Sequence, residues 1–121
     1  MIYVLWQFRV KPEKIEQFER DYGCDGVWAR LFRRSPHYQR TELLRDPAQP
    51  ATYVVIDIWQ DEASYYAFKK EFHEEYQRID HACEALTLEE KPLGIYDAVL
   101  GPRQAGTGSQ FSVLSGQETR E

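Results

Sequence analysis

Apolar residues occupy every second position at the start of the chain: Ile2, Val4, Trp6, Phe8 and Val10. This period of two predicts a strand over residues 2–10 with one apolar face. Two further strands are predicted over residues 37–46 and 52–60, and the latter is apolar on both faces, as suits a central strand. A last strand is predicted within residues 87–97, where Pro92 requires an edge position or a bulge.

Between these strands, apolar residues recur with helical spacing. Pro12 suits the first turn of a helix that ends at Gly23. A short helix is predicted around Trp28 and ends before Pro36. After an expected cap at Asp61, one long helix is predicted by apolar residues at steps of three or four: Tyr65, Phe68, Phe72, Tyr76, Ile79, Cys83 and Leu86.

The order of these elements is β-α-β-β-α-β, which is the ferredoxin-like or split βαβ plan. We therefore expect an α+β domain over residues 1–97, with a four-stranded antiparallel sheet and helices on one face. Residues 98–121 are rich in Gly, Ser and Gln and are expected to form a C-terminal tail. If this tail is ordered, its apolar residues should dock on the domain or on a second copy: Phe111, Val113 and Leu114.

The other face of the predicted sheet is not cleanly polar. Tyr3 and Leu5 lie on it, and the apolar strand over residues 52–60 adds further apolar groups. An exposed patch of this kind usually marks an interface. We expect a homodimer in which two sheets pack face to face about a two-fold axis.

Composition narrows the classes of partner and location. A net charge of −5 argues against nucleic acid, which requires a basic face. No apolar run approaches the roughly 20 residues of a membrane span, and no secretory signal is visible after Met1. Cys24 and Cys83 are too few and too far apart for a disulfide scaffold, so we expect reduced thiols and a cytoplasmic location.

Three stretches carry a family resemblance: residues 8–14 (FRVKPEK) before the helix of Phe18, residues 26–32 (GVWARLF) and residues 56–65 (IDIWQDEASY). Over roughly residues 1–97 the chain resembles the antibiotic biosynthesis monooxygenase (ABM)-like superfamily of dimeric α+β barrels. The resemblance implies this fold and a homodimer. It leaves the activity open, because members include cofactor-free oxygenases of quinol-like aromatics, haem-degrading oxygenases and proteins of no known activity.

The haem-degrading members resemble one another in an Asn on the first strand and in a Trp and a His on the long helix. Here the corresponding strand position is Trp6, and the long helix contains no Trp. His73 and His81 do not fall where the iron-binding His of those relatives would lie. Haem degradation is therefore not what this resemblance implies.

Cofactor-free oxygenation needs a pocket that holds an electron-rich aromatic anion beside O2 and excludes water. Aromatic side chains could form such a pocket, and the candidates for substrate binding are Trp6, Trp28, Trp59, Tyr65, Tyr66 and Phe68. The alternative is that these aromatics simply form the hydrophobic core. A cavity would favour the first interpretation, and a solid core would favour the second.

Two residues are candidate catalytic proton acceptors. His73 lies one step from the apolar side of the long helix, where a histidine could titrate near neutral pH or simply be half-exposed. Asp57 interrupts an apolar strand, so its carboxylate needs a donor, and the candidate partners are Gln7, Arg9, Arg40 and Arg45. A structural ion pair or a dimer contact is the alternative role for Asp57.

The sequence contains no C-x-x-C or H-E-x-x-H motif and no glycine-rich phosphate loop between a strand and a helix. We therefore expect neither a metal nor an organic cofactor. Two functions stay open. One is a cofactor-independent monooxygenase of a small aromatic or polycyclic substrate, and the other is a non-catalytic small-molecule-binding or accessory protein on the same dimeric scaffold.

Overall fold

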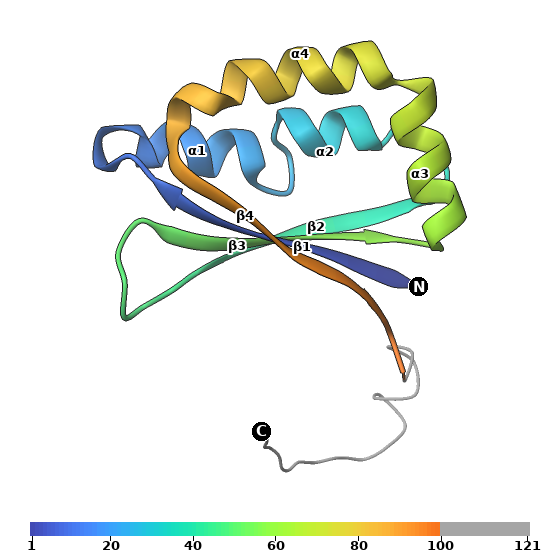
Figure 1. The fold of residues 1–121 in the computed structure, drawn as a ribbon, viewed down its shortest axis with the longest axis horizontal. Helices are drawn as coiled ribbons and strands as arrows, with labels where there is room; N and C mark the ends of the chain where they lie inside the picture. Colours follow the sequence, from blue (N-terminus) through green and yellow to red (C-terminus); the bar gives the residue numbers. More distant parts are fainter. Residues whose placement is uncertain (100–121) are drawn as a thin grey trace.

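The computed structural model describes residues 1–99 of the chain and contains one four-stranded antiparallel sheet in the order β2-β3-β1-β4 (Figure 1). The strands are β1 (Ile2–Val10), β2 (Tyr38–Arg45), β3 (Thr52–Trp59) and β4 (Thr87–Asp97). The predicted ferredoxin-like α+β fold is confirmed. The residues proposed to dock the tail, Phe111, Val113 and Leu114, lie outside the described residues.

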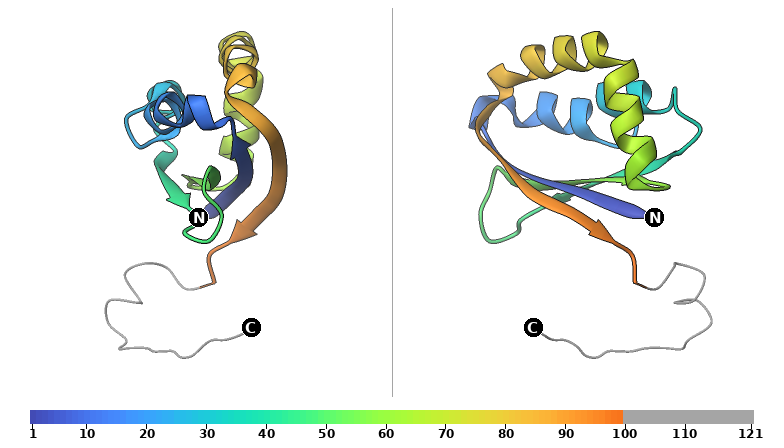
Figure 2. Two further views of the ribbon diagram at one scale, coloured as in Figure 1. Left: turned by 90° about the vertical axis from the view of Figure 1, so that its left-hand side faces the viewer. Right: turned by 45° about the vertical axis from the view of Figure 1, so that its right-hand side comes forward.

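Helical segments cover one face of this sheet, while the opposite face carries none in residues 1–99 (Figures 1 and 2). Strand β4 bends around the edge of the sheet toward helix α4, so the sheet and the helices partly enclose the space between them (Figure 2). The segments in chain order are η1 (Pro12–Lys14), α1 (Ile15–Tyr22), α2 (Val27–Phe32), α3 (Glu62–Glu71), α4 (His73–Cys83) and η2 (Glu84–Leu86).

The single long helix predicted after Asp61 is two helices. Its start is as expected, because the Asp61 carboxylate accepts a hydrogen bond of 2.8 Å from the Ser64 backbone N–H. At Phe72 the backbone leaves the helical region, with φ −105° and ψ 32°, and the chain changes direction (Figure 1). The bend directs α3 toward the sheet and carries α4 across the face above β4.

The strand register decides which side chains face the helices. Val4 of β1 lies opposite Asp57 of β3, which in turn lies opposite Thr41 of β2, so all three point into the helix-covered layer. Aromatic rings dominate this layer. The buried aromatic residues are Phe8, Phe18, Tyr22, Trp28, Phe32, Tyr53, Trp59, Tyr65 and Phe68.

Strand β4 is an edge strand with a bulge at its proline. Leu5 pairs with Gly94 and Trp6 pairs with Pro92, so Leu93 is an extra residue on β4. Gly94 adopts φ +136°, a conformation that L side chains rarely adopt. The expectation that Pro92 occupies an edge or a bulge is confirmed.

Apolar side chains also gather on the face of the sheet that the described helices leave uncovered. The register assigns to this face Tyr3, Leu5, Leu44, Val54, Ile56 and Tyr96. Leu44 and Tyr96 retain 50% and 55% of their exposure. No helix in residues 1–99 combines the length and apolar character needed to cross a membrane.

The rings around Phe18 give a direct test of the aromatic core. Phe18 is fully buried, and its ring centroid lies 4.3 Å from that of Tyr22 and 5.0 Å from that of Tyr53. Phe18→Ala should lower the free energy of unfolding by about 3–5 kcal/mol, because it removes buried contacts and leaves a cavity. Urea denaturation measures this change. Gln17→Ala, an exposed change on the same helix, should stay within about 0.5 kcal/mol, and equal effects of the two changes would contradict this core.

Candidate active site

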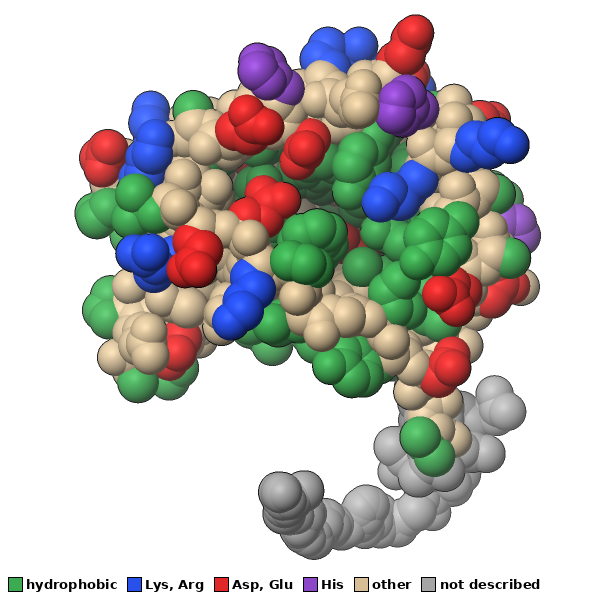
Figure 3. All heavy atoms as spheres, viewed as in Figure 1, with side chains coloured by type: hydrophobic (Ala, Val, Ile, Leu, Met, Phe, Trp, Pro, Cys, Tyr) green, Lys and Arg blue, Asp and Glu red, His purple; other side chains and the backbone are tan. Residues whose placement is uncertain are grey.

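A cavity of about 220 Å³ lies between the helices and the inner face of the sheet. Six aromatic rings line it: Trp6, Phe8, Tyr22, Trp28, Phe32 and Tyr76. Figure 3 shows the surface hollowed between α4 and β4, with hydrophobic side chains around the opening. Every strand and each of the four α-helices contributes at least one lining residue, so the fold as a whole shapes this cavity.

A larger surface hollow, of about 1030 Å³, lies beside the β2–β3 turn. Both of its carboxylates are already bound: Glu19 accepts a hydrogen bond from Tyr53 and lies 3.6 Å from Arg45, and Asp46 accepts one from the Ala48 backbone N–H. The aromatic cavity instead contains a buried carboxylate with no salt-bridge partner among residues 1–99. Chemistry rather than size therefore identifies the aromatic cavity as the candidate site.

The walls of the cavity are rings that hold one another in place. The rings of Trp28 and Tyr76 meet edge to face, with centroids 5.0 Å apart, and those of Phe8 and Tyr22 are also 5.0 Å apart. Burial raises the pKa of Tyr22 and of Tyr76, so both remain neutral phenols at physiological pH. Trp6 is only half-buried, so part of its indole is free to contact a ligand.

Asp57 supplies the buried carboxylate. It lies on the central strand β3, retains 8% of its exposure, and its Oδ1 accepts a hydrogen bond of 2.7 Å from Thr41 Oγ1. Burial raises the pKa of Asp57 to about 6, and the Thr41 hydrogen bond opposes that rise. At pH 7 the carboxylate is therefore mostly ionised and is a stronger base than an ordinary aspartate.

The hydrogen-bond partner of Asp57 differs from the sequence prediction, since it is Thr41 and not Gln7 or an arginine. The three candidate arginines form other ion pairs: Arg9 with Glu89, Arg40 with Glu42, and Arg45 with Glu19. Side chains alternate between the two faces of a strand, and this explains why Arg9 and Arg40 do not reach Asp57: both point to the opposite face of the sheet. The sequence prediction missed Thr41, because the register that sets it opposite Asp57 on the same face is visible only in the folded sheet.

Three charged residues line the cavity besides Asp57: Lys69 of α3, Asp80 of α4 and Glu90 of β4. The Lys69 ammonium lies 5.2 Å from the ring centroid of Tyr65 and 5.1 Å from that of Tyr76, so it contacts both ring faces. Burial is the largest cause of the raised pKa of Asp80 and of Glu90, and repulsion from neighbouring carboxylates adds to both.

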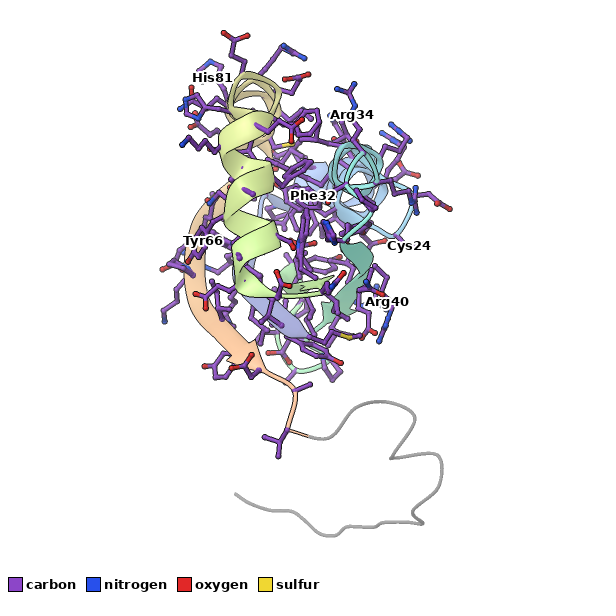
Figure 4. All side chains as sticks on the ribbon, turned by 90° about the vertical axis from the view of Figure 1, so that its right-hand side faces the viewer. Cys24, Phe32, Arg34, Arg40, Tyr66 and His81 are labelled. Carbon is purple, nitrogen blue, oxygen red and sulfur yellow. The ribbon has the colours of Figure 1, made fainter. Side chains whose placement is uncertain are left out.

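The structure separates the residues that the sequence nominated. Trp6, Trp28 and Asp57 line the cavity together. His73 begins α4, is exposed and does not line the cavity. Tyr66 is 50% exposed and lies on the outer side of α3, whereas Phe32 points into the space beneath the helices (Figure 4). The other nominated aromatics are buried and pack in the core without lining the cavity: Trp59, Tyr65 and Phe68.

Several lining residues were not nominated from the sequence. Tyr22 and Tyr76 belong to the apolar sides of predicted helices, so helical spacing could have suggested them. Thr41 becomes recognisable only through its position opposite Asp57. Lys69, Asp80 and Glu90 have ordinary surface positions in the sequence, and only the assembled fold brings them to one opening. Within residues 1–99 no group of three or more His, Cys, Asp or Glu side chains is arranged to hold a metal ion.

Comparison with known proteins bears on both fold and family. Residues 1–80 match the family model described as antibiotic biosynthesis monooxygenase. No curated protein matches the chain. The solved structure of SnoaB, a cofactor-independent oxygenase from Streptomyces nogalater, is 24% identical, with 84% of this chain and 95% of that chain covered and a TM-score of 0.60.

Two further solved structures share the fold at lower identity. A candidate antibiotic biosynthesis monooxygenase from Deinococcus radiodurans is 15% identical, with 95% of this chain and 100% of that chain covered and a TM-score of 0.64. A conserved protein from Methanosarcina mazei is 19% identical, with 78% and 89% covered and a TM-score of 0.59. At these identities the structural likeness shows the fold alone.

The pKa of Asp57 predicts a dependence of stability on pH. The folded value of about 6 exceeds the unfolded value of 3.8, so the folded chain binds the proton more tightly. Burial of the ionised carboxylate thus opposes folding above pH 6, and this cost disappears as the pH falls from about 6 toward 4. Asp57→Asn should be more stable than wild type at pH 7.5, by roughly 1–3 kcal/mol, because its side chain is neutral at every pH.

Urea denaturation of both proteins at pH 7.5 and at pH 4.5 measures this difference. Other carboxylates titrate equally in the two proteins and cancel in the comparison. The advantage of Asp57→Asn should shrink at pH 4.5. A variant that is less stable than wild type at pH 7.5 would show that the Asp57 carboxylate is paired with a cation in the folded protein.

Proposed function

The chain belongs to the antibiotic biosynthesis monooxygenase family, whose model matches 80 of its 121 residues, and on that premise we propose that it is a cofactor-independent monooxygenase. The proposed substrate is a small electron-rich aromatic compound with a weakly acidic hydroxyl or C–H group. The observation that carries the proposal is the ionisable carboxylate of Asp57 inside a cavity walled by aromatic rings. SnoaB, which has the same fold, is itself a cofactor-independent oxygenase, so the fold is compatible with this chemistry.

The size and lining of the cavity suit a planar ring. Its volume of about 220 Å³ is below the roughly 300–1000 Å³ of pockets for drug-sized ligands, which favours one or two fused rings. A larger polycyclic substrate would have to extend through the opening between α4 and β4. Trp6 and Trp28 offer ring faces or edges for stacking, and burial of the ring would displace water from the site.

In the proposed reaction, Asp57 accepts a proton from the substrate and leaves a delocalised substrate anion. The anion transfers one electron to O2, and the two radicals combine to form a C–O bond and a peroxide anion. Asp57 returns its proton to the peroxide, and loss of water leaves a carbonyl group on the ring. The substrate loses two hydrogens and gains one oxygen, the second oxygen of O2 leaves as water, and Asp57 ends ionised.

A second copy of the chain is the proposed occupant of the uncovered face of the sheet. The apolar side chains on this face cluster around the centre of β1 and β3, and charged pairs such as Arg40–Glu42 share the same face. An apolar centre with a polar rim is the usual pattern of a protein interface. A two-fold axis would bury this face on both copies and complete the α+β barrel.

The first test separates the two nominated proton acceptors. Asp57→Asn should lower kcat/KM for O2-dependent oxidation by at least about 100-fold, because the base is lost while the shape is kept. His73→Ala should retain activity, because His73 is exposed and away from the cavity. Oxygen uptake with naphthol, hydroquinone and anthrone substrates measures turnover, without added flavin, metal or nicotinamide.

For wild type, kcat/KM should rise with pH through about 6 and then level off, since the ionised form of Asp57 is the active one. Equal activity in Asp57→Asn would remove this residue from the mechanism. Binding of these compounds without turnover above spontaneous oxidation would favour the alternative function, a non-catalytic small-molecule-binding or accessory protein.

The second test concerns the dimer. Sedimentation at micromolar concentration should give twice the chain mass of 14.3 kDa. Leu5→Arg places a charge at the centre of the uncovered face and should shift the protein toward the monomer. Ala67→Arg, an exposed change on α3, is the matched control and should leave the dimer intact. A wild-type protein that sediments as a monomer would contradict the proposed assembly.

A further inference from the structure

Strand β2 contains an irregularity beside the cavity. Tyr38 pairs with Trp59 and Arg40 pairs with Ile58, so Gln39 is an extra residue on β2. In a regular strand, Tyr38 and Thr41 would face opposite sides of the sheet, because they are three positions apart. The bulge at Gln39 instead places both side chains on the face that the helices cover, and bulges commonly redirect a side chain in this way next to functional sites.

The side chains of Tyr38 and Thr41 form a hydrogen-bonded chain to Asp57. Tyr38 Oη lies 2.6 Å from Thr41 Oγ1, and Thr41 Oγ1 donates to Asp57 Oδ1 over 2.7 Å. A threonine hydroxyl has a single proton, so while Thr41 donates to Asp57 it can only accept from Tyr38. Two donors in series are thereby directed at one carboxylate oxygen. The Tyr38 ring is fixed by Phe32 and Trp59, at centroid distances of 5.6 and 5.4 Å.

The second carboxylate oxygen of Asp57 is in a different situation. Oδ2 has no hydrogen-bond partner among residues 1–99, yet it is not one of the fully buried atoms that lack a partner. Because Asp57 lines the cavity, its accessible Oδ2 is the oxygen available to a ligand. The two oxygens therefore have separate roles, since one is bound by the protein and the other is open to the cavity.

We propose that Tyr38 and Thr41 are positioning residues: Thr41, itself held by Tyr38, occupies Asp57 Oδ1 and so makes Oδ2 the atom that accepts the substrate's proton. The proton transfer itself rests on the proposed oxygenase function, but the arrangement at Asp57 does not. Neither Tyr38 nor Thr41 has to contact the reacting atoms. Their effect is to hold the carboxylate in one orientation and to favour its ionised form through the bond to Oδ1.

The titration of Asp57 in the absence of substrate tests this arrangement. In protein labelled with ¹³C at aspartate Cγ, the Asp57 resonance is identified by its loss in Asp57→Asn and followed from pH 4 to pH 9. Three variants are compared: Thr41→Val, which keeps the shape without the hydroxyl; Thr41→Ser, which keeps the hydroxyl; and Tyr38→Phe, which removes only the phenolic oxygen. Other titratable groups around the cavity stay unchanged in all three: Tyr22, Tyr65, Lys69, Tyr76, Asp80 and Glu90.

Thr41→Val should raise the titration midpoint of Asp57 by roughly one pH unit, because it removes the hydrogen bond that favours the ionised carboxylate. Tyr38→Phe should raise it in the same direction by a smaller amount, since Thr41 is then free to rotate. Thr41→Ser should stay near wild type. An unchanged midpoint in Thr41→Val, or the same rise in Thr41→Ser as in Thr41→Val, would overturn the role of Thr41, and an unchanged midpoint in Tyr38→Phe would overturn that of Tyr38.

Activity measurements on the same variants separate this inference from the proposed function. If the protein is an oxygenase, the pH at which kcat/KM rises should move with the Asp57 midpoint in each variant. Shifted midpoints without turnover of any substrate would support the positioning chain and contradict the oxygenase. Turnover whose pH profile is the same in Thr41→Val as in wild type would contradict the positioning chain and leave the oxygenase standing.

Discussion

At the centre of the β-sheet lies the Asp57 carboxylate, which has no salt-bridge partner among residues 1–99, and the cavity and the proposed chemistry are organised around it. Asp57 lies on β3, an inner strand, with 8% of its exposure remaining, and the one hydrogen bond to its carboxylate within residues 1–99 comes from the neutral hydroxyl of Thr41. Burial of an ionised carboxylate opposes folding unless a cation or several donors compensate for it. Such a group is commonly kept where function requires it, which is why the cavity around Asp57 is the centre of our account.

The aromatic layer shapes the space in which that carboxylate acts. Large flat rings packed at angles to one another resist collapse, so a small cavity can persist between Trp6, Trp28 and Tyr76. The bend at Phe72 contributes as well, because it carries α4 across the cavity and brings Tyr76 and Asp80 to its edge. Core and site are thus built from the same residues, which is why composition alone could not separate a pocket from a solid core.

The sequence predicted the fold well because its signals were local. Apolar residues at every second position predicted β1, and Pro92 indicated an edge position or a bulge for β4. The break at Phe72 was missed because apolar steps of three and four continue through it, so the pattern is the same for one helix or two. The site depends on how distant segments pair. Thr41 of β2 lies opposite Asp57 of the neighbouring strand β3, and a bulge at Gln39, which the hydrophobic pattern does not reveal, turns Tyr38 toward the helices.

A crystal structure of the full chain soaked with a naphthol would reveal whether Asp57 meets a ligand in this cavity. We expect electron density for the ligand in the cavity, with its ring against Trp6 and Trp28. The hydroxyl oxygen should lie about 2.6–3.2 Å from Asp57 Oδ2, while Thr41 still donates to Oδ1. An Asp57 carboxylate paired with an arginine or lysine, or a closed cavity with the ligand bound elsewhere, would contradict the account.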